Sequence, residues 1–182
     1  MDIPHEITIT YLEMLAHPAK SPSHTLSGTV ALIRAEKPPV HFYRYLYDTI
    51  GKDYYWVDRW RMPDEQLTAI IHNDDVKIYV LHHNGVPAGF AELDFRLFPQ
   101  AELSMLGLMP EQIGEGLGVY LLHEAINLAW SQEINRLIVQ TCTLDHPHAL
   151  PLYQRCGFTP YEQENGILKQ PADWPSPTAN RL

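Results

Sequence analysis

The chain has 182 residues, 45% of them hydrophobic, which suits one domain with a sizeable core. Its 22 acidic and 13 basic side chains give a net charge of −9, which argues against nucleic acid as a partner because phosphate backbones attract clustered Lys and Arg. The chain shows neither a membrane-length apolar run nor a secretory leader, and its two cysteines lack paired spacing, so we expect a cytoplasmic protein with no membrane partner.

The apolar pattern predicts strands and helices in alternating groups. In chain order they are a strand at 7–14, helices at 42–50 and 63–71, strands at 77–82, 87–95 and 102–108, a helix at 119–130, a strand at 137–142, a helix at 148–155 and an extended segment at 158–162. Asn84-Gly85 predicts a hairpin turn, and residues 18–27 predict a loop. This order indicates an α+β or mixed α/β sheet, followed from Gly166 by a proline-containing tail that wraps the surface or is loose.

Alternating glycines interrupt the strand-to-helix junction at residues 113–119, Ile-Gly-Glu-Gly-Leu-Gly-Val. Gly114, Gly116 and Gly118 permit backbone conformations closed to other residues, so several N–H groups can point at one anion. The following helix adds unpaired amides and a partial positive charge. We therefore expect a phosphorylated ligand, although a plain tight connection explains the glycines equally well on its own.

Two other phosphate-binding loops fail on spacing. A Walker loop ends in Gly-Lys-Ser/Thr, whereas Gly118 is followed by Val119 and Tyr120. A dinucleotide-binding loop has Gly-x-Gly-x-x-Gly, whereas the spacing here is Gly-x-Gly-x-Gly. The loop thus indicates phosphate without naming the molecule.

A second motif follows after an intervening strand. Residues 145–158, Asp-His-Pro-His-Ala-Leu-Pro-Leu-Tyr-Gln-Arg-Cys-Gly-Phe, resemble the Asn-x-x-Ala-x-x-x-Tyr-x-x-x-Gly-Phe pattern of the GNAT superfamily of acyl-CoA-dependent N-acetyltransferases. The glycine loop resembles the Arg/Gln-x-x-Gly-x-Gly pattern of the same family. With the order of elements, the resemblance extends from Ile7 to about Glu162.

The resemblance implies a GNAT fold in residues 1–165 and a Pro-rich C-terminal tail in residues 166–182. The fold would be a mixed sheet of six to seven strands, splayed between its fourth and fifth strands and flanked by about four helices. Acetyl-CoA would be the co-substrate, with its pantetheine arm in the gap and its pyrophosphate on the glycine loop. The implied cofactor-binding residues are Leu106, Leu108, Ile113, Gly114, Glu115, Gly116, Leu117, Gly118, Val119 and His146.

Three positions depart from the family pattern. Ile113 replaces the usual Arg or Gln, Glu115 stands where Lys or Arg is usual, and His146 replaces Asn. A carboxylate beside a pyrophosphate weakens binding unless it points to solvent, whereas the backbone amides are unaffected. The departures at Ile113 and Glu115 support an alternative hypothesis, a non-catalytic acyl-CoA-binding sensor or scaffold with the same fold.

The resemblance also assigns catalytic roles in an acyltransferase. Tyr153 matches the tyrosine that protonates the leaving thiolate, although the residues alone favour a core tyrosine on a short helix. For the base that deprotonates the amine we favour Glu102 over Glu92, while either carboxylate can instead attract a cationic substrate.

The acceptor is expected to be a primary amine, as a small molecule or a peptide. The implied wall comprises the aromatic residues Tyr43, Tyr47, Tyr55 and Trp56, which suit an amine with an apolar body, although ordinary helix packing accounts for at least some of them. The ten histidines lack zinc-type spacing, so we expect no metal. The sequence leaves a homodimer open.

Overall fold

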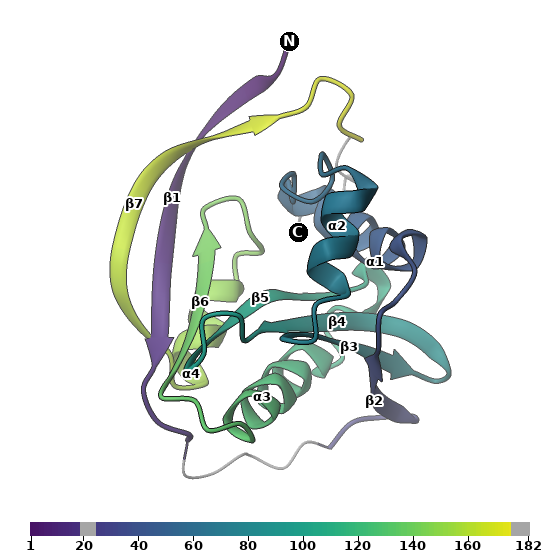
Figure 1. The fold of residues 1–182 in the computed structure, drawn as a ribbon, viewed down its shortest axis with the longest axis vertical. Helices are drawn as coiled ribbons and strands as arrows, with labels where there is room; N and C mark the ends of the chain where they lie inside the picture. Colours follow the sequence, from purple (N-terminus) through teal and green to yellow (C-terminus); the bar gives the residue numbers. More distant parts are fainter. Residues whose placement is uncertain (19–24, 176–182) are drawn as a thin grey trace.

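One seven-stranded sheet organises the computed structural model, which describes residues 1–18 and 25–175 (Figure 1). The strands are β1 (Ile3–Met14), β2 (Val30–Ala35), β3 (Val76–His83), β4 (Val86–Asp94), β5 (Gln100–Leu108), β6 (Arg136–Cys142) and β7 (Thr159–Gln170). Their order across the sheet is β2-β3-β4-β5-β6-β1-β7. β5 and β6 are parallel and the other neighbours are antiparallel, so the predicted mixed sheet is confirmed.

Helices cover both faces of this sheet. α1 (Val40–Gly51) and α2 (Asp64–Ile71) pack with Phe90 and Val80 into one core, and α3 (Leu117–Trp130) and α4 (Ala149–Arg155) belong to the core on the other face. The described residues also contain two short 3-10 turns. η1 (Lys52–Tyr54) lies in the connection between α1 and α2, and η2 (Pro110–Gln112) directly precedes the glycine loop. Within the described ranges, no helix has both the length and the apolar character needed to cross a membrane.

The hairpin between β3 and β4 forms where Asn84-Gly85 predicts it. Both residues have positive φ, 52° and 86°, the geometry of a type I′ turn, whose twist matches that of the flanking strands. The hairpin fixes the register of β4 against β3. The buried residues of β4 lie between the two cores.

The sheet is splayed between β5 and β6. Their pairing extends only from Gln100 opposite Arg136 to Glu102 opposite Ile138. From Leu103 to Leu108 the edge of β5 that faces β6 has no strand partner among the described residues. β5 and β6 are the fourth and fifth strands of the sequence prediction, so the predicted opening is confirmed.

Two parts of the sequence prediction are wrong. β2 was not predicted; it is an edge strand with half-exposed apolar residues, so its local pattern is weak. The tail expected from Gly166 is instead the second half of β7, because Gly166–Gln170 pairs with Ile3–Ile7. Most of the predicted 18–27 loop, at 19–24, and residues 176–182 of the tail lie outside the described residues.

Candidate active site

The glycine loop connects β5 to α3 with a backbone that only glycine adopts easily. Gly114 has φ +99°, and Gly116 has φ +77° as the N-cap of α3. A Cβ atom added at Gly114 would meet nothing within 4 Å, so open space lies beside the loop. The glycines therefore permit the turn and keep its outer surface accessible to a ligand.

Backbone amides of this loop are unpaired. Tyr120 N donates to the Gly116 carbonyl, but no amide from Gly114 to Val119 donates to another described residue. Unpaired amides at a helix N-terminus bind anions, and the free edge of β5 at Leu106 and Leu108 offers further backbone groups to an extended amide-containing chain. These two features fit the pyrophosphate and pantetheine of an acyl-CoA.

The two substitutions in the loop leave this arrangement intact. The side chains of Ile113 and Glu115 are both exposed, so the carboxylate has solvent beside it. Leu117 is buried in the core under α3, so only its backbone faces the loop. The loop thus offers only backbone amides to an anion, because it lacks the cation that the family pattern places there.

His83, a residue without a sequence signal for this role, holds the start of the loop. Its Nδ1 lies 2.7 Å from Gln112 Oε1, and its Nε2 lies 2.9 Å from the Ser27 carbonyl. These hydrogen bonds raise the pKa of His83, because the protonated ring can donate to both oxygens. β3 is thereby tied to η2, directly before the glycines.

Tyr153 lies on α4, the helix that follows β6, on the β6 side of the opening between β5 and β6. It is 7% exposed, and its ring meets Phe158 edge-on with centroids 5.9 Å apart. Burial, with a contribution from Asp145, raises its pKa, so the side chain stays a protonated phenol at neutral pH. No described residue hydrogen-bonds to the hydroxyl, which leaves its proton available.

His146 precedes α4 and contacts aromatic rings from two different segments. Its ring lies 5.9 Å from that of Tyr54 and 5.1 Å from that of His148. Burial, and then the neighbouring His148, lower the pKa of His146, which favours the neutral ring. The contact with Tyr54 places His146 against the connection between α1 and α2.

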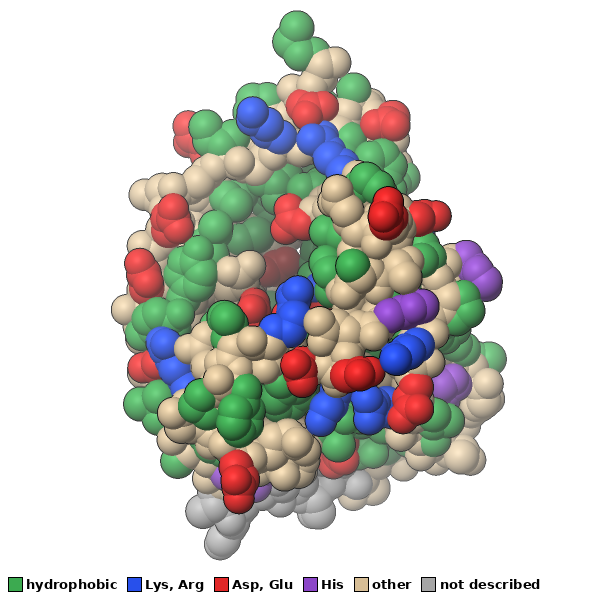
Figure 2. Space-filling view, in the orientation of Figure 1, with side chains coloured by type: hydrophobic (Ala, Val, Ile, Leu, Met, Phe, Trp, Pro, Cys, Tyr) green, Lys and Arg blue, Asp and Glu red, His purple; other side chains and the backbone are tan. Residues whose placement is uncertain are grey.

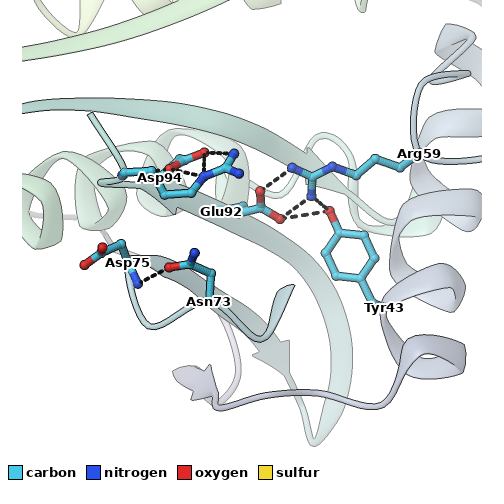
Figure 3. Close-up of polar contacts among 7 residues, drawn as sticks. Tyr43, Arg59, Asn73, Asp75, Glu92 and Asp94 are labelled. Carbon is cyan, nitrogen blue, oxygen red and sulfur yellow. Dashed lines mark hydrogen bonds and ion pairs between the residues drawn. The ribbon is translucent and has the colours of Figure 1, made fainter. Parts of the chain in front are cut away.

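Glu92, the second candidate base, is held in a buried ion pair. Its carboxylate is fully buried and lies 2.5 and 2.6 Å from the two terminal nitrogens of Arg59 (Figure 3). Tyr43 donates to the same carboxylate at 2.8 Å and accepts from Arg59. A bidentate pair of this kind satisfies the carboxylate, so the geometry gives Glu92 a structural role in joining β4 to the α1–α2 connection.

Glu102 differs from Glu92 in having no such partner. It lies opposite Asp94 across β4 and β5, and no described group donates a hydrogen bond to its carboxylate. Burial, and then the Asp94 and Glu92 carboxylates, raise the pKa of Glu102. It lines a cavity of about 300 Å³ whose other lining residues are Asp94, Arg96, Leu97, Gln100 and Ala101. Half-burial and a raised pKa are properties expected of a carboxylate that acts as a general base.

The four aromatic residues predicted as an acceptor wall divide into two pairs. Tyr43 and Tyr47 are almost fully buried in the core under α1, which is the packing alternative raised from the sequence. Tyr55 and Trp56 are half-buried in the connection after η1. Trp56 packs against Tyr47 with ring centroids 5.3 Å apart. Tyr43 and Tyr47 thus belong to the core, whereas Tyr55 and Trp56 keep part of their surface exposed.

A hollow separates α1 and α2 from β6 and β1. Figure 2 shows it in the face turned to the viewer, with apolar side chains along its β1–β7 side and acidic side chains at its depth. We call it the acceptor well, after the role proposed for it below. In residues 1–18 and 25–175, no group of three or more metal-ligating side chains occurs, there or elsewhere.

Arg59, like His83, is a residue of the site that the sequence interpretation missed. Its partner is 33 positions away, so no local spacing reveals the pair. One signal was present: Glu92 interrupts the apolar run Ala88–Leu93, and a charge in a buried strand requires a partner.

The comparisons with known proteins agree with this geometry. Residues 43–158 match the family model described as Acetyltransferase (GNAT) family, which includes both motifs. No curated protein sequence is significantly similar to the chain.

Solved structures share the fold at low sequence identity. A functionally unknown conserved protein from Staphylococcus epidermidis has a TM-score of 0.64 at 16% identity, over 92% of this chain and 63% of its own. A putative GNAT-family acetyltransferase from Novosphingobium aromaticivorans has 0.62 at 17%, over 94% and 68%. An aminoglycoside acetyltransferase from an uncultured soil sample has 0.56 at 15%, over 70% and 86%. The chain thus spans less than two thirds of the first of these, and at such identities the likeness concerns the fold.

Proposed function

Because the chain belongs to the GNAT family of acetyltransferases, we propose that it transfers the acetyl group of acetyl-CoA to a primary amine by direct attack. In this proposal the amides from Gly114 to Val119 bind the pyrophosphate, and the β5 edge at Leu106 and Leu108 binds the pantetheine arm. The acceptor amine occupies the acceptor well on the other side of the opening.

The reaction forms one C–N bond and breaks one C–S bond. Glu102 takes a proton from the amine, directly or through a water, so that the neutral nitrogen can attack the thioester carbonyl carbon. The Leu108 backbone N–H polarises the carbonyl oxygen. As the C–S bond breaks, Tyr153 gives its proton to the thiolate, and the nitrogen loses its remaining excess proton to solvent to become an amide. Glu102 then releases its proton to solvent, and Tyr153 regains a proton from solvent.

The strongest support is the contrast between Glu92 and Glu102, the two candidate bases. Arg59 neutralises Glu92, whereas Glu102 forms no ion pair with a described residue, although Arg59 and Arg96 act on it from a distance, and it has a raised pKa and an adjacent cavity. This contrast supports Glu102, rather than Glu92, as the group that accepts a proton from a substrate. We extend the proposal to a cytoplasmic enzyme that uses no metal and acts without nucleic acid or membrane, with a homodimer left open.

The test compares Tyr153→Phe with the parent in a thiol-release assay across a panel of primary amines. The variant is expected to lose about 100-fold or more in turnover, as for removal of a general acid, while its calorimetric affinity for acetyl-CoA is retained. Phe158→Leu, which alters packing next to Tyr153 without removing a proton donor, is the matched control. Equal turnover by Tyr153→Phe and the parent would exclude Tyr153 as the acid.

A sensor or scaffold that binds acyl-CoA without turnover is the second candidate. The observation in its favour is the missing loop cation, since Ile113 and Glu115 occupy the positions concerned. Tight acetyl-CoA binding with no thiol release on any amine of the panel would establish this alternative.

A further inference from the structure

β1 and β7 form a long arm on one side of the acceptor well. They pair from Ile3 opposite Gln170 to Glu13 opposite Thr159, and Figure 1 shows the pair arching away from the rest of the sheet. After Gln170 the chain leaves the arm and crosses toward the α1–α2 side (Figure 1). We call residues 171–174, Pro-Ala-Asp-Trp, the strap.

Trp174 fixes the strap to the connection between α1 and α2. Its indole Nε1 donates to the Lys52 carbonyl at 3.0 Å, and its ring meets Trp60 edge-on with centroids 5.2 Å apart. It also stacks on Tyr55 at 6.3 Å. The side chain is only 7% exposed and its N–H is satisfied, so this contact buries a large apolar surface without leaving a polar group unpaired.

The beginning of the chain reinforces the same junction. The ring of His5 lies 5.0 Å from that of Tyr55, and Asp2 Oδ2 lies 2.8 Å from a terminal nitrogen of Arg61. Three segments distant in sequence, the start of β1, the strap and the α1–α2 connection, therefore meet at one place. Figure 2 shows side chains filling the space above the hollow, where these segments lie.

From these contacts we infer that the strap closes one end of the acceptor well, so that the acceptor enters end-on. This inference rests on the proposed function and narrows its substrate class. A groove open at both ends admits a polypeptide that continues on both sides of an acetylated lysine, whereas a well closed at one end admits only a compact molecule or a chain terminus. Tyr55 and Trp56 offer apolar contacts and the depth of the well is acidic, so the acceptor is a compact amine with an apolar body.

Trp174 is the specificity-determining residue in this account. It touches the aromatic wall from outside the well, so its removal opens the end without deleting a group that contacts the reacting atoms. Selection against long acceptors by steric exclusion requires such a fixed obstacle.

The experiment measures kcat/KM for 2-phenylethylamine and for a decapeptide with a central lysine and a blocked N-terminus. The parent is expected to acetylate the small amine far more efficiently than the peptide. Trp174→Ala is expected to raise the peptide-to-amine ratio by about tenfold or more, because the end of the well is then open. Trp174→Phe, which keeps an aromatic ring there, and Ile167→Ala, an exposed apolar position on β7, are expected to leave the ratio unchanged.

Efficient acetylation of the peptide by the parent, or an unchanged ratio in a folded Trp174→Ala variant, would overturn the inference. Should Trp174→Ala fail to fold, the peptide result with the parent and with Trp174→Phe decides. An absence of turnover on every amine would instead reject the proposed function, and the inference with it.

Discussion

The two halves of the candidate site are held by different kinds of interaction. On the acyl-CoA side, residues 113–119 are mostly exposed, and the backbone amides from Gly114 to Val119 have no partner among the described residues. On the acceptor side, Arg59, Glu92 and Tyr43 are buried and satisfy one another. The first half depends on glycine dihedral angles and tolerates Ile113 and Glu115, whereas the second depends on the identity of each side chain.

The largest expected effect comes from breaking the buried pair on the acceptor side. Arg59→Met leaves the Glu92 carboxylate buried without a counter-charge, which should reduce the free energy of unfolding by about 3–5 kcal/mol. Urea denaturation followed by circular dichroism measures this loss. The double variant Arg59→Met, Glu92→Leu removes both charges and should recover most of it. A loss below about 1 kcal/mol in the single variant would mean that the pair behaves like a surface ion pair.

Removing the unpaired carboxylate should lower activity and raise stability together. Glu102→Gln is expected to reduce kcat/KM by about 100-fold, since a general base is lost. The pKa of Glu102 is raised in the folded protein, so its contribution to stability is present at low pH and is lost as the pH rises through the folded pKa. Gln stays neutral, and we therefore expect a higher Tm for the variant at neutral pH.

The control compares the pH dependence of the rate in the parent with that in the Glu102→Gln variant. In the parent, the rate should fall as the pH falls through the raised pKa of Glu102, above the range of an ordinary glutamate. The Gln variant should lack this acidic limb. An acidic limb at the same pH in both proteins would assign the base to another group.

The smallest effect tests the acyl-CoA side, with two glycines as a matched pair. Gly116→Ala places a side chain at φ +77° where space is available, so backbone strain of about 1–2 kcal/mol is expected, with weaker acetyl-CoA binding. Gly118 lies within α3, and Gly118→Ala makes only an ordinary contact with Leu108, so the fold should tolerate it. Thermal shift and calorimetry measure both, and equal behaviour of the two variants would refute the role of the dihedral angle at Gly116.

The features that the sequence predicts differ from those that it misses in a similar way: the predicted ones are local, and the missed ones depend on distant partners. The glycine loop and the Asn84-Gly85 turn have local signals, whereas the β5–β6 opening was implied by the family resemblance, and the structure contains all three. The second half of β7 and the Arg59–Glu92 pair have no such signal, because each depends on a partner far along the chain. The β7 residues Glu162–Asn165 are polar and precede a glycine, so their strand conformation comes from pairing with β1.

A crystal structure with acetyl-CoA and a compact amine tests the central claim most directly. We expect the pyrophosphate within hydrogen-bonding distance of amides between Gly114 and Val119, and the pantetheine along β5 at Leu106 and Leu108. The thioester sulfur should lie near the Tyr153 hydroxyl, and the amine should lie on the Glu102 side of the opening. A pyrophosphate bound away from the glycine loop, or an amine bound away from Glu102, would contradict the account.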